Sequence, residues 1–234
     1  MAPTKGDHKN TENFIARSWR ALCRPCTRHS LGTVLAVGVV AGITFWGGFN
    51  TAMEASNTEA FCISCHEMEK NVYREYKKTI HYSNRTGVRA TCPDCHVPKQ
   101  WVHMFVRKVQ ATNELFHHIG GSVSTPEKFA AKRLQLAKVV WETMKATDSR
   151  ECRNCHSFLS MDFSAQKENG RRKHKQSLKE DKTCIDCHQG IAHKLPEEFV
   201  EAEHERYERE GVPCADCHKG TARAPADDDW GKDD

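Results

Sequence analysis

The sequence has little hydrophobic material with which to build a core. Hydrophobic residues make up 38% of its 234 residues, and the mean hydropathy is −0.70. These values exclude a polytopic membrane protein, because each span needs about 20 apolar residues. No segment alternates apolar and polar residues over a useful length, which disfavours a β-sheet protein. We therefore expect a mostly helical chain with little regular sheet, whose core is filled in part by something other than side chains.

A basic surface is also missing from most of the chain. Residues 1–30 contain six Lys and Arg but only two Asp and Glu, a local net charge of +4. The whole chain has the same net charge of +4, so residues 31–234 are neutral overall. The sequence therefore predicts a basic N-terminal arm, and it lacks the basic stripe that is typical of nucleic-acid binding.

A single long apolar run follows this arm. Residues 31–49 are 19 residues without a charged side chain, just long enough for a transmembrane helix. Trp46 near the end of the run suits the membrane interface, and the arginines before it place the N-terminus in the cytoplasm by the positive-inside rule. The alternative is a cleaved signal peptide, for which the run and the arm are both long. We expect a single-pass anchor in a bacterial inner membrane, with residues 50–234 in the periplasm.

Each of the 12 cysteines belongs to a C-x-x-C pair, and five of these pairs are followed directly by histidine. The five motifs are Cys62, Cys65 and His66; Cys92, Cys95 and His96; Cys152, Cys155 and His156; Cys184, Cys187 and His188; and Cys214, Cys217 and His218. Two thiols at this spacing reach the two vinyl groups of one haem as thioethers, and the adjacent imidazole reaches the iron, which is the c-type haem signature. Zinc does not require a histidine after every pair, and redox C-x-x-C sites occur singly near a βαβ pattern. The sequence therefore predicts five covalent haem c groups, packed closely enough to exchange electrons.

One C-x-x-C pair, Cys23 and Cys26, has no following histidine. On the predicted topology this pair faces the reducing cytoplasm. We expect two reduced thiols there, with a metal site as the alternative.

Each haem iron also needs a second axial ligand. The candidates are the histidines outside the motifs on the predicted periplasmic side: His81, His103, His117, His118, His174, His193 and His204. Met68, in the sequence CHEM, is a further candidate at the first haem because a Met ligand raises the haem potential, although a Met near a motif often only packs against the ring. His204 lies ten residues before Cys214, so we assign it to the fifth haem.

Two long helices are expected between the second and third motifs. An amphipathic pattern over residues 97–121 ends at a pair of glycines. A second helix is expected to begin with a capping box formed by Ser124 and Glu127. Phe129 and Trp141 recur at helical spacing in this second segment, so we expect them to be packing residues.

Four stretches around the motifs resemble the NapC/NirT family of membrane-anchored multihaem cytochromes c. They are WGGFNTAMEASNTEAFCISCHEM, YKKTIHYSNRTGVRATCPDCHVPKQW, ECRNCHSFLSMDF and KTCIDCHQGIAHKLP, and the resemblance covers roughly residues 15–196. It implies that the protein oxidises quinol in the membrane and passes electrons to a periplasmic reductase, most often nitrate reductase.

The resemblance also implies roles for particular residues. The distal histidine positions of the family are matched by His81, His174 and His193. Met68 matches the family's ligand at the first haem. Lys108 and Glu114 correspond to the quinol-site residues beside that haem, whereas from the helix pattern alone Lys108 would be a snorkelling side chain on an apolar face.

The C-terminus departs from the familiar family pattern, which has four haems and ends near residue 196. A longer pentahaem branch, which serves trimethylamine N-oxide reductase, is similar in carrying one extra haem. We expect the extra haem here either to extend the electron path or to replace a separate small carrier. The regions that we predict are a basic arm (1–30), a transmembrane anchor (31–49), a tetrahaem domain (50–196), an extension with the fifth motif (197–221) and a disordered acidic tail (222–234).

We interpret the chain as a quinol dehydrogenase and electron conduit rather than a terminal catalyst. Its expected partners are membrane quinol and a periplasmic reductase or soluble cytochrome. One alternative is the reverse flow, from a periplasmic oxidation into quinone. Another is a terminal multihaem reductase with an open iron, which is disfavoured because no C-x-x-C-K motif occurs and the candidate distal ligands outnumber the irons.

Overall fold

The computed structural model describes residue 17, residues 28–214 and residue 218. Almost all of the predicted arm, the Cys23 and Cys26 pair, Cys217 and the predicted tail (222–234) lie outside the described residues. The chain divides into two compact units, Met1–Ala52 and Met53–Asp234.

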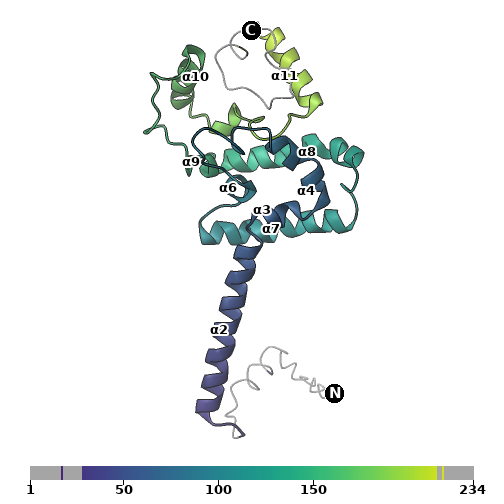
Figure 1. Cartoon of the computed structure of the whole chain (residues 1–234), viewed down its shortest axis with the longest axis vertical. Coiled ribbons are helices and arrows are strands. Elements are labelled where there is room, and N and C mark those ends of the chain that lie inside the picture. Colours follow the sequence, from purple (N-terminus) through teal and green to yellow (C-terminus); the bar gives the residue numbers. More distant parts are fainter. Residues whose placement is uncertain (1–16, 18–27, 215–217, 219–234) are drawn as a thin grey trace, which may run out of the picture. The chain divides into compact units, whose positions relative to one another are not determined.

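The described residues form helices and no strand (Figure 1), which confirms the predicted fold class. The α-helices are α2 (Leu31–Ala55), α3 (Glu59–Ile63), α4 (His66–Lys70), α5 (Val72–Tyr76), α6 (Cys92–His96), α7 (Trp101–Ile119), α8 (Pro126–Ala146), α9 (Arg150–Arg153), α10 (Glu168–Lys179) and α11 (Glu197–Arg209). A short 3₁₀ helix, η1, covers Cys184–Asp186.

Helix α2 contains the predicted apolar run and continues beyond it to Ala55. Its 25 residues make a helix about 38 Å long, which is more than the hydrocarbon core of a bilayer. It is long and apolar enough to cross a membrane, and none of its most apolar stretch is buried inside the protein. Such an exposed apolar surface is unfavourable in water, so α2 has the properties that the predicted anchor requires.

The ends of α7 and α8 follow from local sequence. Helix α7 stops at Gly120, and Gly121 follows with φ +64°, a conformation that glycine adopts at little cost. The predicted capping box at α8 is wrong by one residue: Thr125, not Ser124, is the N-cap, and its hydroxyl accepts a hydrogen bond from Lys128 N. Pro126 takes the first helical position, which suits its fixed φ and its lack of an N–H group, so the cap must be the residue just before it.

The apolar core of side chains is small, as the composition indicated. The buried hydrophobic residues in the described part of the chain are Met53, Tyr76, Phe129, Trp141 and Ile185. Phe129 and Trp141 are thus buried as predicted. So few buried side chains agree with the expectation that groups other than side chains fill part of the core.

Short helices that carry the cysteine motifs pack against one another. Helix α3 contacts α6, and α6 contacts α9, while α8 contacts η1. The backbone N–H of Ile185 in η1 also donates a hydrogen bond to the Ser149 hydroxyl, just before α9. The first four motifs are therefore neighbours in space in the same order as in the sequence.

Candidate haem-binding sites

Each motif histidine faces one histidine from elsewhere in the chain. The five pairs, with their ring-centroid distances, are His66 and His118 (6.0 Å), His96 and His193 (6.2 Å), His156 and His81 (6.2 Å), His188 and His174 (6.0 Å), and His218 and His204 (6.1 Å). Of the seven candidate distal histidines, His103 and His117 are in none of these pairs; His117 is instead hydrogen-bonded to the Ser122 hydroxyl.

This common separation matches the one expected for two imidazoles that share a metal ion. With metal–nitrogen bonds of about 2 Å and a ring radius of about 1.2 Å, two imidazoles on opposite sides of one metal have centroids about 6 Å apart. Ordinary aromatic pairs have centroids about 4.5–7 Å apart, so the argument rests on the repetition of nearly the same distance at each of the five motif histidines. The five pairs therefore fit iron held between two imidazoles, one motif histidine and one distal histidine at each site.

Hydrogen bonds to two of the distal histidines fix their tautomers. The Nδ1 atom of His174 lies 2.7 Å from the Gln166 side-chain oxygen, and that of His204 lies 2.9 Å from the Val200 carbonyl oxygen. Both partners are oxygens that accept hydrogen bonds, so Nδ1 carries the proton in each ring. The Nε2 lone pair is then available to a metal, as in metal sites where an outer acceptor orients the ligand.

Burial keeps several of these imidazoles neutral, which is the form that binds iron. It lowers the pKa of His96 to about 4, and the nearby His193 and Arg107 contribute in the same direction. Burial also lowers the pKa values of His81, His188 and His193. These side chains therefore require no deprotonation at neutral pH before they could ligate a metal.

Long-range polar contacts hold His193 opposite His96. The Glu75 carboxylate in α5 accepts hydrogen bonds from Arg133 in α8, at 2.5 Å, and from the backbone N–H of Lys194, at 2.9 Å. Arg133 also donates to the Lys194 carbonyl oxygen. Both backbone groups of the residue after His193 are thus fixed by charged side chains, and the position of the imidazole follows.

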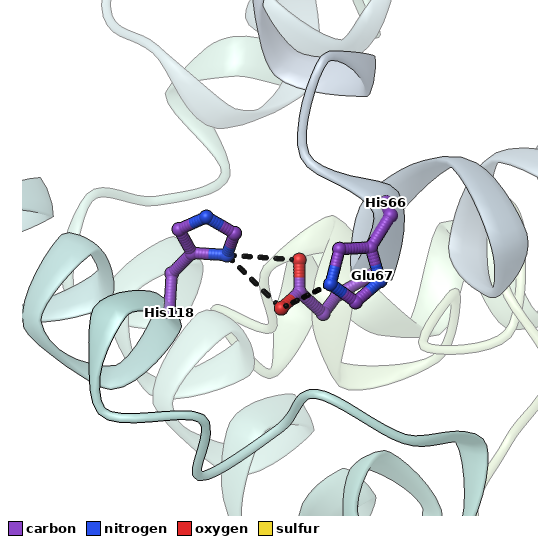
Figure 2. A group of neighbouring side chains, drawn as sticks. All are labelled: His66, Glu67 and His118. Carbon is purple, nitrogen blue, oxygen red and sulfur yellow. Dashed lines mark hydrogen bonds and ion pairs between the residues drawn. The ribbon is translucent and has the colours of Figure 1, made fainter.

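The first site differs from the others because a carboxylate contacts both of its rings (Figure 2). Nδ1 of His118 lies 3.0 Å from each carboxylate oxygen of Glu67, and Nε2 of His66 lies 3.2 Å from one of them. Glu67 is only 3% exposed. Burial disfavours its charge, but a hydrogen bond from its own backbone N–H and the contact with His118 outweigh that effect and lower its pKa. The site therefore contains a buried, ionised carboxylate.

Met68 lies in the same segment, two residues after His66, and is 37% exposed. The imidazole that faces His66 is that of His118. The Glu67 carboxylate, however, contacts nitrogens of both rings, so an iron between them would have to displace it, and Met68 remains the ligand that the resemblance implies.

The cysteine contacts follow the order of the motifs. The thiol of Cys62 is hydrogen-bonded to that of Cys92, which lowers the pKa of Cys62. The thiols of Cys152 and Cys184 are also hydrogen-bonded to each other, which lowers the pKa of Cys184. Cys95 lies close enough to Cys155 for the two groups to interact electrostatically. All the described cysteines are free of disulfides. Attachment points one to four therefore form a continuous series.

Lys108 and Glu114 are both near the first motif but do not form a pair. The Lys108 ammonium donates to the Ser56 carbonyl oxygen at 2.5 Å and lies 5.9 Å from the Phe61 ring centroid. Burial, together with the charge of Arg107, lowers the pKa of Lys108. Glu114 instead pairs with Arg107 at 2.6 Å, and its side chain is 63% exposed. The positive charge of Lys108 lowers the pKa of the Cys62 thiol, and the negative charge of Glu114 raises it.

Comparison with known proteins agrees with this geometry. The profile described as "NapC/NirT cytochrome c family, N-terminal region" matches residues 24–198, well over half of the chain. The chain belongs to the NapC/NirT cytochrome c family. The resemblance noted from the motifs is therefore confirmed.

Curated relatives cover most of the chain. "Denitrification system component NirT" of Stutzerimonas stutzeri is 62% identical over 79% of this chain and 92% of its own length. "Cytochrome c-type protein NapC" of Escherichia coli K12 is 53% identical over 82% of this chain and 96% of its own. "Cytochrome c-type protein TorC" of the same strain is 43% identical over 78% of this chain but only 47% of its own length. No solved structure matches the chain.

Membership of the NapC/NirT family confirms that the protein is a membrane-anchored multihaem cytochrome with covalently bound haem c. The donor sets described above fit that cofactor, because they consist of paired cysteines and of imidazoles at metal-bridging separation. The fifth pair, His204 and His218, lies beyond residue 198, where the family profile ends.

The sequence analysis missed two residues that shape these sites, Glu67 and Ser149, and did not assign His118 to a particular haem. Glu67 follows a motif histidine directly, but nothing in the local sequence shows that it is buried. His118 was one of seven distal candidates without an assigned site. Ser149 is completely buried and adopts φ +48°, and its role in connecting the third and fourth motifs depends on a contact 36 residues away.

Proposed function

We propose that this protein carries five haem c groups, each held between two histidines, and that it conducts electrons from membrane quinol to a periplasmic reductase. The observation that carries this proposal is the set of five histidine pairs at 6.0–6.2 Å, one for each C-x-x-C-H motif. In each pair one imidazole comes from a motif and the other does not.

The order of the motifs in space supports a conduit. Contacts connect the first motif to the second, the second to the third and the third to the fourth. Bound haem iron would supply the one-electron carriers along this series. The residues of the chain fix the spacing and the ligands, and they shield several of the imidazoles partly from water.

The first site is the proposed entry point for electrons. Lys108 is a partly buried cation beside Cys62, and it can donate a hydrogen bond to a quinol oxygen in place of the Ser56 carbonyl. Oxidation of one quinol releases two electrons and two protons. The exposed carboxylate of Glu114 is the proposed proton acceptor on the same helix. We propose that the N-terminus is cytoplasmic and that residues 50–234 are periplasmic, so these protons leave on the periplasmic side.

The fifth site is the proposed extension of the electron path. Helix α11 is attached to α8 by contact between the Phe199 and Trp141 rings, whose centroids are 4.8 Å apart. Helix α8 also contacts η1, which carries the fourth motif. The fourth and fifth sites thus share one supporting helix, which is the arrangement expected if electrons pass between them.

A terminal reductase is a poorer fit to the geometry. Such an enzyme needs an iron with an open axial position for its substrate. Each of the five motif histidines instead faces a second imidazole. Nitrate reductase is the periplasmic acceptor that we propose, because curated relatives that are 53–62% identical are named NapC and NirT.

Two measurements on the purified holoprotein test the proposal. The intact mass should exceed the polypeptide mass by five haems, and an optical redox titration should show only low-spin, six-coordinate haem. Addition of quinol should then reduce the haems within the time of a stopped-flow experiment. A mass excess of four haems would remove the fifth site from the proposal, and a failure of quinol to reduce haems that dithionite does reduce would refute the quinol-oxidising role.

A further inference from the structure

Helix α10 carries a concentration of positive charge that the proposed conduit does not use. Its 12 residues include five Lys and Arg against one acidic residue, Glu168, a net charge of +4. Residues 31–234 as a whole are neutral. The charge of α10 is therefore a local feature and does not reflect the average surface.

The basic side chains of α10 gather on one face. A surface hollow is lined by Glu168, Arg171, Arg172, Lys175, Gln176 and Lys179. These positions recur at intervals of three and four residues, which places them along one side of the helix. Arg171, Lys175 and Lys179 form no ion pair with any described residue. We call Arg171, Arg172, Lys175 and Lys179 the basic face.

The other side of α10 belongs to the fourth haem site. On a regular helix Lys179 and Arg172 lie about 140° and 160° around the axis from His174, whereas Arg171, at the edge of the basic face, lies about 60° from it. The His174 ring faces that of His188 at 6.0 Å, and the Phe158 and Phe163 rings also contact it. The basic face is therefore separated from the fourth site by a single helix.

We propose that the basic face of α10 is a docking surface for an acidic protein that accepts electrons from the fourth site. This inference rests on the proposed function, because it assumes that electrons leave the chain, and it makes the fourth site an exit in addition to a step toward the fifth. Each productive encounter reduces one oxidised acceptor by one electron, and quinol supplies that electron. Like-signed side chains around a hollow create a field that attracts an oppositely charged partner and raises its association rate.

Helix α11 is the competing surface, because its charge has the opposite sign. Its acidic residues, however, are partly neutralised within the helix: Glu203 and Glu210 contact Arg206, and Glu205 contacts Arg209. The basic face contains only one acid, Glu168, among its lining residues. The net charge of α11 is −4, equal in size to the +4 of α10, so the basic face is distinguished by its charges gathering around one hollow, whereas those of α11 are partly paired within that helix.

The test uses the full-length holoprotein in detergent with two oxidised acceptors, an acidic and a basic c-type cytochrome. The docking variant is Arg171→Glu, Lys175→Glu and Lys179→Glu together. At low salt, the second-order rate constant for electron transfer from this variant to the acidic cytochrome should be at least about tenfold below that of the wild type, since electrostatic steering changes association rates by about 10–10³. Isothermal titration calorimetry with the same cytochrome should show a comparable rise in Kd. Raising the ionic strength to about 0.15 M should slow the wild type more than the variant.

The matched control reverses three exposed cations on other elements: Lys70→Glu, Arg85→Glu and Lys138→Glu. It changes the net charge equally, and its rate and Kd with the acidic cytochrome should stay within about twofold of the wild type. Unchanged Soret spectra and melting temperatures exclude misfolding in either variant. The proposal would be overturned if the control and docking variants lost rate and affinity for the acidic cytochrome equally, or if neither variant lost any.

A second comparison addresses α11. The variant Glu201→Gln, Glu205→Gln and Glu208→Gln should leave transfer to the acidic cytochrome unimpaired. The proposal also fails if the basic cytochrome is the faster acceptor and this variant abolishes its advantage, because electrons would then leave beside α11. If dithionite but not quinol reduces the haems, and the docking variant still loses affinity, the quinol-oxidising role is wrong while the docking surface stands.

Discussion

Replacement of Lys108 by Gln should slow quinol oxidation without disturbing the haem sites. In the structure the Lys108 ammonium has one hydrogen-bond acceptor, the Ser56 carbonyl oxygen at 2.5 Å. A quinol oxygen bound there would receive a charge-assisted hydrogen bond, which is worth about 1.5–3 kcal/mol. At about 1.4 kcal/mol for each factor of ten, its loss should lower kcat/KM for quinol by roughly 10- to 150-fold.

The assay is stopped-flow reduction of the haems by excess quinol, followed at the Soret band. Reduction by dithionite, haem content and melting temperature should match the wild type, since dithionite does not need the quinol site. Lys99→Gln is the matched control, because Lys99 is an exposed cation near the start of α7 with only a weak contact of 4.0 Å to Asp94. Equal quinol kinetics for the wild type and Lys108→Gln would refute the assignment of Lys108 to the quinol site.

Three further substitutions test the architecture around the sites. Ser149→Ala should lower the free energy of unfolding by about 1–3 kcal/mol in thermal or denaturant melts, because it leaves the Ile185 N–H without its acceptor; the exposed Ser160→Ala should change it by less than about 0.5 kcal/mol. Glu67→Gln removes the buried negative charge beside His118, so the midpoint potential of one haem should rise in a redox titration, whereas an unchanged set of potentials would contradict this role. Phe199→Ala removes the ring contact with Trp141, worth about 0.5–1.5 kcal/mol beyond burial, so limited proteolysis should cut α11 faster while the rest of the chain remains protected.

The first site shows why some neighbours of a motif histidine are harder to infer than others. His81 and His193 matched family positions, and the structure places both opposite motif histidines. At the first site the resemblance implied Met68, which lies only two residues from His66. The ring that faces His66 comes from His118, at the far end of α7. A contact across 52 residues depends on the path of a whole helix, which no local pattern reports.

The quinol-site residues illustrate the same limit. Lys108 and Glu114 lie on one helix, and their separation of six residues turns them about 120° apart on a regular helix. The sequence therefore could not say whether they meet. In the structure Glu114 pairs with Arg107, and Lys108 reaches back to Ser56. The two charges share the neighbourhood of Cys62 without touching each other.

The covalent chemistry of this protein follows from its sequence alone. Thioether attachment and the adjacent ligand are encoded within five consecutive residues, so the spacing C-x-x-C-H suffices to predict each site. The apolar run of α2 and the shortage of core side chains are likewise local or compositional properties. The pairing of the histidines, the burial of Glu67 and the order of the motifs in space belong to the tertiary structure. They arise because helices that are distant in sequence pack together, and the distances between them are set by that packing and by no single segment.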